Sequence, residues 1–397
     1  MILESEKRIK AVLAGRQLDA RQKMKKIEDI FEETCEKNHS DAEVLTIIQG
    51  VGTVPREQSG REIIYDKNSL ASYKFVKKGD FIIHLRSFEG GLEVANSDGI
   101  VSPAYIILHP KIEVSTIYLY ALFHTNRFIN QTMAPAVEGA RDGRSVKYDV
   151  LKKQKISFPP IGEQKKIAEI LATQDRVIEL KEKLIAEKQS QKKYLMSVLL
   201  GDDFKKPFKL NGVTIDKKKW EKSTIGKISD ISTGNKDTQN KKDNGKYPFY
   251  VRSPNPEKID TYSYDGEAIL TAGDGVGVGK VIHYVTGKFD FHQRVYKISD
   301  FDNHKAWGRF VYFYFLEHFY NRVKRMSAKN SVDSVRYNMI SEMPLNLPAL
   351  PEQKAIAEVL SAADEEISLL QKDLEQEKLK KKSLMQLLLT GLVRVKV

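Results

Sequence analysis

The glycine-rich run Thr271–Lys280, TAGDGVGVGK, is the segment of this chain most like a phosphate-binding loop. Such a loop needs the spacing GxxxxGK followed by Ser or Thr, because its backbone N–H groups cradle phosphates and the hydroxyl holds magnesium. Here Val281 follows the lysine, and Asp274 stands where the first glycine should be. Apolar runs on both sides are typical of strands. We therefore interpret the run as a hairpin or loop and not as a nucleotide site.

Two other kinds of catalytic signature are absent from the sequence. An amino-group methyltransferase needs an Asn/Asp-Pro-Pro-aromatic loop to hold the target amine, but the Pro-Pro pair here stands in the order FPPI, residues 158–161. His283, His292 and His304 have carboxylates nearby but no paired metal-ligand spacing such as HxxxH, so we interpret them as surface or core histidines. We also find no carboxylate–lysine cluster suited to a metal-dependent nuclease. The sequence favours a binding protein with no catalytic residue, cofactor or metal of its own.

The composition indicates an anionic partner. The chain has 397 residues and a formal net charge of +12, which suggests that it binds nucleic acid. Cys35 is the single cysteine, so an internal disulfide and a cysteine-rich zinc site are excluded. The first residues lack the apolar core of a signal peptide, and the most hydrophobic run, Phe310–Phe319, is short and contains charge. We expect a cytoplasmic protein without a membrane partner.

An internal repeat defines the elements that must position any binding residues. Glu163–Leu200 recurs at Glu352–Leu389, displaced by 189 residues without a gap. The copies open with EQKKIAEIL and EQKAIAEVL and end with KKYLMSVLL and KKSLMQLLL. The same displacement relates SVKYDVL at 145–151 to SVRYNMI at 334–340. The period is too long for a solenoid, so the repeat indicates a duplicated half-molecule.

Each copy is predicted to be one long helix. Neither contains Gly or Pro, prolines precede both, and Gly201 and Gly391 follow them. The 38 repeated residues would span about 57 Å. Apolar residues with an alternating four–three spacing predict a coiled-coil seam; in the second copy they are Ile356, Leu360, Ala363, Ile367, Leu370, Leu374, Leu384 and Leu388. Polar residues interrupt this register at Gln174, Lys181, Lys188, Lys192, Glu377 and Lys381. The seam does not identify its partner, which is the sister copy or another chain.

Two globules with short β-like runs and one aromatic helix each are predicted at residues 40–150 and 213–345, joined by a basic connector, Gly201–Lys219. We divide the chain into a first domain with an N-terminal helical lead (1–158), a central helix (159–203), the connector with a second domain (204–347) and a C-terminal helix (348–397). The lead is expected to be helical over residues 1–31 and is a candidate to brace the long helices.

The motifs PPIGEQKKIAEIL and PALPEQKAIAEVL, each followed by a KKxLMxxLL ending, resemble those of type I restriction–modification specificity subunits. The resemblance covers nearly the whole chain and includes WEKSTIGKISDISTGN, KYPFYVRS and DGEAILTAGDG in the second globule. One departure is that the first globule has no tryptophan equivalent to Trp220 at its start. Ile27–Ile30 is a candidate for the later part of that opening.

The resemblance implies an α+β fold with two mixed α/β target-recognition domains, separated by a pair of long antiparallel coiled-coil helices with pseudo-twofold symmetry. It further implies a non-catalytic subunit that reads a bipartite site in double-stranded DNA, with an unread spacer set by the helices. Two methyltransferase subunits, which use S-adenosylmethionine, would bind the helices, and a restriction translocase–nuclease subunit would complete the complex. The alternatives are a divergent self-sufficient DNA modification enzyme and a non-specific DNA-binding coiled-coil scaffold.

Candidates for DNA contact are loop residues that present paired donors or acceptors to bases, or cations and hydroxyls to phosphates. They are Arg86, Ser87, Arg141, Arg144, Ser145, Lys147, Arg252, Asn255, Gln293, Arg294, Lys329, Asn330, Ser334 and Arg336. Two globules that read different sequences should share phosphate contacts and differ in base contacts. We therefore assign the matched residues Lys147 and Arg336 to phosphates. Four of the unmatched residues are our candidates for base contact, namely Arg86, Asn255, Gln293 and Asn330.

Overall fold

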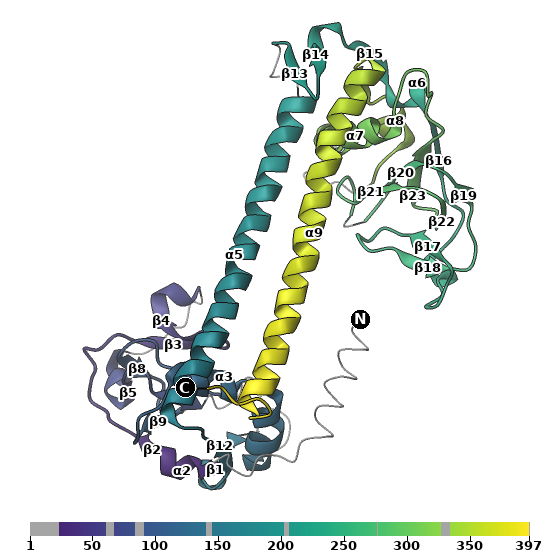
Figure 1. The fold of residues 1–397 in the computed structure, drawn as a ribbon. Coiled ribbons are helices and arrows are strands. Elements are labelled where there is room, and N and C mark those ends of the chain that lie inside the picture. Colours follow the sequence, from purple (N-terminus) through teal and green to yellow (C-terminus); the bar gives the residue numbers. More distant parts are fainter. Residues whose placement is uncertain are drawn as a thin grey trace. The chain divides into compact units, whose positions relative to one another are not determined.

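The chain divides into two compact units in the computed structural model, which describes residues 24–60, 67–83, 91–139, 145–201, 206–275, 277–326 and 334–396. The first unit is Met1–Lys181 with Asp373–Val397, and the second is Glu182–Lys372. Each holds one mixed α/β domain and one half of each long helix, α5 (Ile161–Leu200) and α9 (Leu350–Leu389) (Figure 1). No helix among the residues described is long and apolar enough to cross a membrane.

The domain of the first unit is built on a four-stranded sheet with the order β2-β9-β6-β7. Its strands are β1 Met24–Lys26, β2 Phe31–Thr34, β3 Leu45–Ile48, β4 Gly52–Pro55, β5 Lys74–Val76, β6 Phe81–Ile83, β7 Glu93–Val94, β8 Gly99–Val101, β9 Ile106–Pro110, β10 Val137–Glu138, β11 Ser145–Val146 and β12 Lys155–Ser157. Its short helices are α2 Ile27–Ile30, α3 Thr116–Phe123 and α4 Tyr148–Leu151. The aromatic helix expected at 117–124 is confirmed as α3.

The domain of the second unit repeats this plan, with a sheet of order β16-β23-β20-β21. Its strands are β13 Phe208–Leu210, β14 Val213–Ile215, β15 Glu221–Thr224, β16 Asp230–Thr233, β17 Tyr247–Tyr250, β18 Glu257–Ile259, β19 Tyr264–Asp265, β20 Ala268–Ala272, β21 Ile282–Val285, β22 Lys288–Phe291, β23 Val295–Ser299 and β24 Pro344–Leu347. Its helices are α6 Ile225–Ile228, α7 Gly308–Met326 and α8 Tyr337–Ser341. Strands β17 and β22 run parallel within a second sheet of order β18-β17-β22-β19.

The start of the first domain differs from the helical lead that was expected. Residues 1–23 lie outside the described part of the chain, but Met24–Lys26 is a strand, and Phe31 begins another. Strand β1 pairs with β12 just before α5, as β15 pairs with β24 just before α9. Helix α2 follows β1 as α6 follows β15, so Ile27–Ile30 takes the place of the later part of the second domain's opening. The strand is required here because the residues before each long helix need a hydrogen-bonded partner.

The two long helices are confirmed, each with 40 residues, or about 60 Å. All eight apolar residues predicted for the seam of α9 are buried or half-buried. Gly391, with φ of 74°, follows the end of α9 in the left-handed conformation that commonly terminates helices. The α+β fold class is confirmed by the mixed domains and by the antiparallel pairing of the helix halves within each unit.

The polar residues that interrupt the seam identify its partner. In the first unit Gln174 Nε2 donates to Glu377 Oε2 at 2.6 Å, and Lys181 pairs with Asp373. In the second unit Lys188 Nζ lies 2.6 Å from Glu366 Oε1. Two further ion pairs, Asp175–Lys381 in the first unit and Asp364–Lys192 in the second, are equivalents of each other under the 189-residue displacement. Every one of these interruptions therefore pairs with the sister helix, which is the alternative that the sequence left open.

The glutamine of each EQK motif joins a long helix to the aromatic helix of its own domain. Gln164 and Gln353 are fully buried, and each Nε2 donates to the carbonyl five residues earlier, at 2.9 and 2.8 Å. The Oε1 of Gln164 accepts from the N–H of Ser115, which caps α3, at 3.0 Å. The Oε1 of Gln353 accepts from the N–H of Trp307, immediately before α7, at 2.8 Å. Because an unpaired buried amide is costly, these bonds fix where each domain meets its helix.

Each domain core extends onto the long helices. In the first unit Phe31, Phe81 and Phe123 stack edge-on or tilted, with ring centroids 5.1–6.0 Å apart. The cluster around them includes Ile167 of α5 and Leu388 of α9. In the second unit the core around α7 likewise includes residues of α5 and α9, namely Met196, Leu199, Leu200, Ile356, Ala357 and Leu360. Burial of shared apolar surface makes each domain and its helix halves one packed body.

Candidate nucleic-acid interface

The residues predicted to contact DNA fall into two groups. Six of them, Arg86, Ser87, Arg141, Arg144, Lys329 and Asn330, lie outside the described residues. The other eight are Ser145, Lys147, Arg252, Asn255, Gln293, Arg294, Ser334 and Arg336. All of these are exposed or half-exposed, as a contact with a large ligand requires.

Four of the predicted residues come together in the second unit. Arg252 lies in the loop between β17 and β18, Gln293 and Arg294 in the turn between β22 and β23, and Ser334 ahead of α8. The backbone joins these loops: Gly273 N–H donates to the Arg294 carbonyl at 2.7 Å, and an isolated β-bridge pairs Asp274 with Ser334. We call Arg252, Asp274, Gln293, Arg294 and Ser334 the loop cluster.

Asp274 is the member of the loop cluster that sequence reasoning missed. Its Oδ1 accepts from Arg252 Nη1 at 2.9 Å, and its Oδ2 lies 3.7 Å from Arg294 Nε. The sequence drew attention to Asp274 only because it spoils a phosphate-loop pattern. The predicted hairpin is confirmed, since β20 and β21 pair antiparallel on either side of it.

The loop cluster continues onto a second carboxylate and a histidine. Gln293 Nε2 donates to Asp237 Oδ2 at 2.7 Å, and Gln293 N–H donates to the carbonyl of Lys236 at 2.8 Å. The neighbouring His292 is buried, and burial together with the charges of Arg252 and Arg294 lowers its pKa below the usual value. The charges of Asp237 and Asp274 act in the opposite direction, so both arginines of the loop cluster lie beside carboxylates.

The residues matched between the two domains occupy equivalent places. Lys147 and Arg336 are the N-terminal capping residues of α4 and α8, and both are exposed. Lys147 Nζ lies 3.9 Å from Glu138 Oε2, a long distance for an ion pair. Tyr337 is largely exposed, whereas Tyr148 is half-buried. The equal placement and exposure of Lys147 and Arg336 suit a contact that both domains make in the same way, whereas the two tyrosines differ.

In the first domain a buried ion pair supports the hairpin between β3 and β4. Glu93 Oε1 lies 3.1 Å from His124 Nε2 and accepts from Gly50 N–H at 2.8 Å, while Tyr120 hydroxyl donates to Oε2 at 3.3 Å. Burial opposes ionisation of Glu93, but these hydrogen bonds more than offset it, so its pKa is lowered. Burial also opposes protonation of His124, but Glu93 more than offsets it and the pKa of His124 is raised. Neither residue showed a functional pattern in the sequence.

This pair predicts a pH-dependent stability of the first unit. The raised pKa of His124 contributes stability below its ordinary pKa of 6.5, which is lost as the pH rises through the raised value. The lowered pKa of Glu93 contributes stability above 4.5, which is lost as the pH falls through the lowered value. We therefore expect His124→Gln to cost about 1 kcal/mol or more between pH 4.5 and 6.5, and less once the pH exceeds the raised pKa of His124. Urea unfolding of both proteins across this pH range measures the difference, and a constant difference would contradict the assignment.

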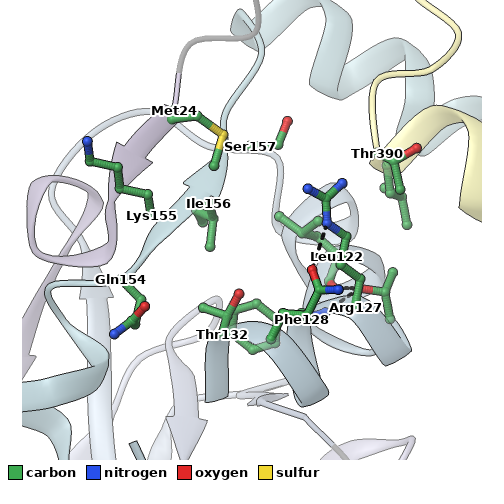
Figure 2. A pocket seen from close by; sticks show the side chains of 13 residues that line it. Met24, Leu122, Arg127, Phe128, Thr132, Gln154, Lys155, Ile156, Ser157 and Thr390 are labelled. Atoms are coloured by element: carbon green, nitrogen blue, oxygen red, sulfur yellow. Dashed lines mark hydrogen bonds between the residues drawn. The ribbon is translucent and has the colours of Figure 1, made fainter. Parts of the chain in front are cut away.

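A pocket of about 230 Å³ opens in the first unit, and neither Ser145 nor Lys147 lines it (Figure 2). It is lined by Met24, residues 154–157, the segment from Leu122 to Thr132, and Leu389 and Thr390 at the end of α9. Arg127 Nε donates to Gln131 Oε1 at 3.3 Å beside it. Among the residues described, no group of three metal-binding side chains exists in this pocket or elsewhere. The loop cluster, and not this pocket, is the better candidate for the functional site.

Two domains of one plan, a net charge of +12 and an arginine-bearing loop cluster define a two-module nucleic-acid-binding protein. The sequence matches the family described as "Type I restriction modification DNA specificity domain" twice, over residues 22–188 and 217–379. The chain belongs to this family of type I restriction–modification specificity subunits, as the sequence motifs suggested.

Relatives of known kind agree with this membership. The type I restriction enzyme MjaVIII specificity subunit of Methanocaldococcus jannaschii is 27% identical over 369 residues, which cover 84% of this chain and 85% of the relative. The crystal structure of a type I restriction–modification S subunit from M. genitalium covers 94% of this chain and 98% of its own, with a TM-score of 0.59 and 15% identity. The HsdS subunit from Thermoanaerobacter tengcongensis covers 95% and 98%, with a TM-score of 0.51 and 14% identity. The two structures show the shared fold.

Proposed function

We propose that the two domains each read one half of a bipartite site in double-stranded DNA, and that the chain itself is not catalytic. The observation that carries this proposal is the repetition of one domain plan with different loops, because a shared scaffold with different reading loops suits two different half-sites. Methyl transfer would belong to the methyltransferase subunits of the complex, which bind S-adenosylmethionine, and DNA translocation and cleavage to a restriction subunit.

We assign different tasks to the two kinds of loop residue. Lys147 and Arg336, exposed at the start of α4 and α8, would contact phosphates in both half-sites. Arg252, Gln293 and Arg294, which lie outside the repeated segments 334–340 and 352–389, would contact bases of the half-site that the second domain reads. Asn255 is exposed in the same loop as Arg252 and is assigned to bases. The remaining candidates, including Arg86 and Asn330, keep their sequence-based assignment.

The long helices would serve both as spacer and as docking surface. The two helices are each about 60 Å long, which is the same order of length as the 34–36 Å interval at which major-groove faces recur along DNA. Leu180 is 49% exposed and Leu369, its equivalent in the repeat, is 57% exposed. An apolar side chain exposed at the same register in both copies supports equivalent docking sites for two methyltransferase subunits.

Selection from a random pool of duplex DNA tests this proposal. The full-length chain is expected to retain DNA with two short specified segments separated by a gap of constant length. Retained molecules are sequenced, and a lysine-rich protein without sequence preference serves as the control for charge alone. Retention of DNA with no consensus, or with one ungapped consensus, would contradict the two-reader proposal.

A further inference from the structure

Asp274 holds two arginines that come from two different loops. Its carboxylate accepts from Arg252 Nη1 at 2.9 Å and lies 3.7 Å from Arg294 Nε. Both arginines are exposed, whereas the side chain of Asp274 is only 26% exposed, so the carboxylate lies beneath the guanidinium groups. An arginine fixed in this way gives up little conformational freedom when it binds.

From this arrangement we propose that Asp274 determines the sequence specificity of the second domain, by orienting Arg252 and Arg294 toward bases and keeping them from phosphates. The inference rests on the proposed function, because it names a residue that refines how one domain reads its half-site. Asp274 is a positioning residue here, and the two arginines make the contact.

Among the residues that the structure describes, none is bound to the reading edges of the two arginines. The carboxylate occupies Nη1 of Arg252, so the edge formed by Nε and Nη2 points elsewhere. It faces Nε of Arg294, so the edge formed by Nη1 and Nη2 remains. Each edge carries two parallel N–H donors, which match the O6 and N7 acceptors of guanine. The cluster therefore fits a half-site that contains guanine.

The glycine-rich run is what allows Asp274 to occupy this position. A Cβ on Gly273 would lie 2.8 Å from the Arg294 carbonyl, so only glycine lets the loop approach the turn so closely. Gly275 has φ of 78°, which disfavours other residues. The run that resembles a phosphate loop thus places a carboxylate, and not a phosphate, between the arginines.

The sign of the charge separates bases from phosphates. A phosphate that approaches either arginine is repelled by Asp274, and exchanging one anion for the other releases little energy. The guanine acceptors carry only partial charges, so the carboxylate repels them much less than it repels a phosphate and continues to hold the guanidinium group. Asp274 should therefore weaken binding to DNA in general while it strengthens the preference for particular bases.

The test compares full-length wild-type protein with Asp274→Asn in the random-pool selection and in binding to one unrelated duplex at several salt concentrations. We expect the variant to lose about 10-fold or more of its base preference at one or two positions of a single half-site. On the unrelated duplex it should bind at least as tightly as wild type, with the slope of log K against log salt steeper by up to about 0.9 for each new phosphate contact. Glu257→Gln is the matched control, because it also removes a carboxylate from an exposed ion pair of the same unit, with Lys241 at 3.5 Å, and should leave the consensus unchanged.

Arg252→Lys provides the second variant. It keeps the positive charge but lacks the paired donors, so we expect loss of base preference in the same half-site without tighter binding to unrelated DNA. An unchanged consensus in Asp274→Asn, or equal weakening on every sequence, would overturn the inference. A change in both half-sites would assign Asp274 to folding and would overturn it as well. If wild type itself selects no gapped consensus, the proposed function fails together with the inference.

Discussion

Replacing Arg394 with alanine is expected to lower the free energy of unfolding of the first unit by about 2–3 kcal/mol. Arg394 Nε donates to Glu163 Oε1 at 2.6 Å, and Nη2 donates to the other carboxylate oxygen. The side chain of Glu163 is 5% exposed, so removal of the arginine would leave a buried carboxylate without its bidentate partner. The expected loss is below that of a fully buried pair, because the side chain of Arg394 is 36% exposed.

Two probes distinguish the units in this experiment. Trp220 and Trp307 are the two tryptophans of the chain, and both lie in the second unit, so their fluorescence follows that unit while circular dichroism follows both. In Arg394→Ala the circular dichroism transition should move to lower urea concentration than the fluorescence transition. The single variant Glu163→Gln and the double variant Glu163→Gln with Arg394→Ala complete a double-mutant cycle. A coupling energy below about 0.5 kcal/mol would show that this ion pair does not stabilise the unit.

Lengthening both long helices is expected to lengthen the unread gap in the DNA site. Seven residues inserted after Lys181 and seven after Lys372 would add about 10 Å to each helix and keep the seven-residue register of the seam. Every contact within either unit would be retained, because both insertions fall at the boundaries between the two units, after Lys181 and after Lys372. Ten ångströms correspond to about three base pairs, and because added base pairs also rotate the duplex, we expect a gap longer by about one to three.

The measurement is again selection from a random DNA pool. The original site should bind the lengthened protein at least about 100-fold more weakly, since a shifted half-site loses several base contacts at about 1–3 kcal/mol each. An insertion in α5 alone is the control, because it moves Lys188 and Lys192 away from Glu366 and Asp364 and should destabilise the pairing. An unchanged gap in the double insertion would mean that the helices are not the spacer.

The helices were predictable from sequence because their signals are local. The absence of Gly and Pro, the glycines at the ends and the seam positions all depend on neighbours within a few turns. The start of the first domain was not, because β1 forms only by pairing with β12, more than a hundred residues later in the chain. A three-residue strand has no periodicity of its own from which it could be recognised.

The candidate site shows the same division. Arg252, Gln293 and Arg294 were identified one by one, from the donors that loops of this kind can present to bases. The joining of Arg252 and Arg294 through Asp274 depends on three loops of one domain that are adjacent only after the sheets form. The partner of the helical seam was also undecided, since Lys188 and Glu366 are far apart in the sequence and no residue type identifies its mate.

The 189-residue repeat by itself determined that the chain has two equivalent halves, where the long helices run and to which family it belongs, because each rests on the order of residues along the chain. Only the tertiary structure decided that the seam pairs with its sister copy, that both EQK glutamines fasten a helix to its domain, and that a carboxylate lies between two arginines. These contacts depend on distances between segments that are remote in sequence, and folding alone brings such segments together.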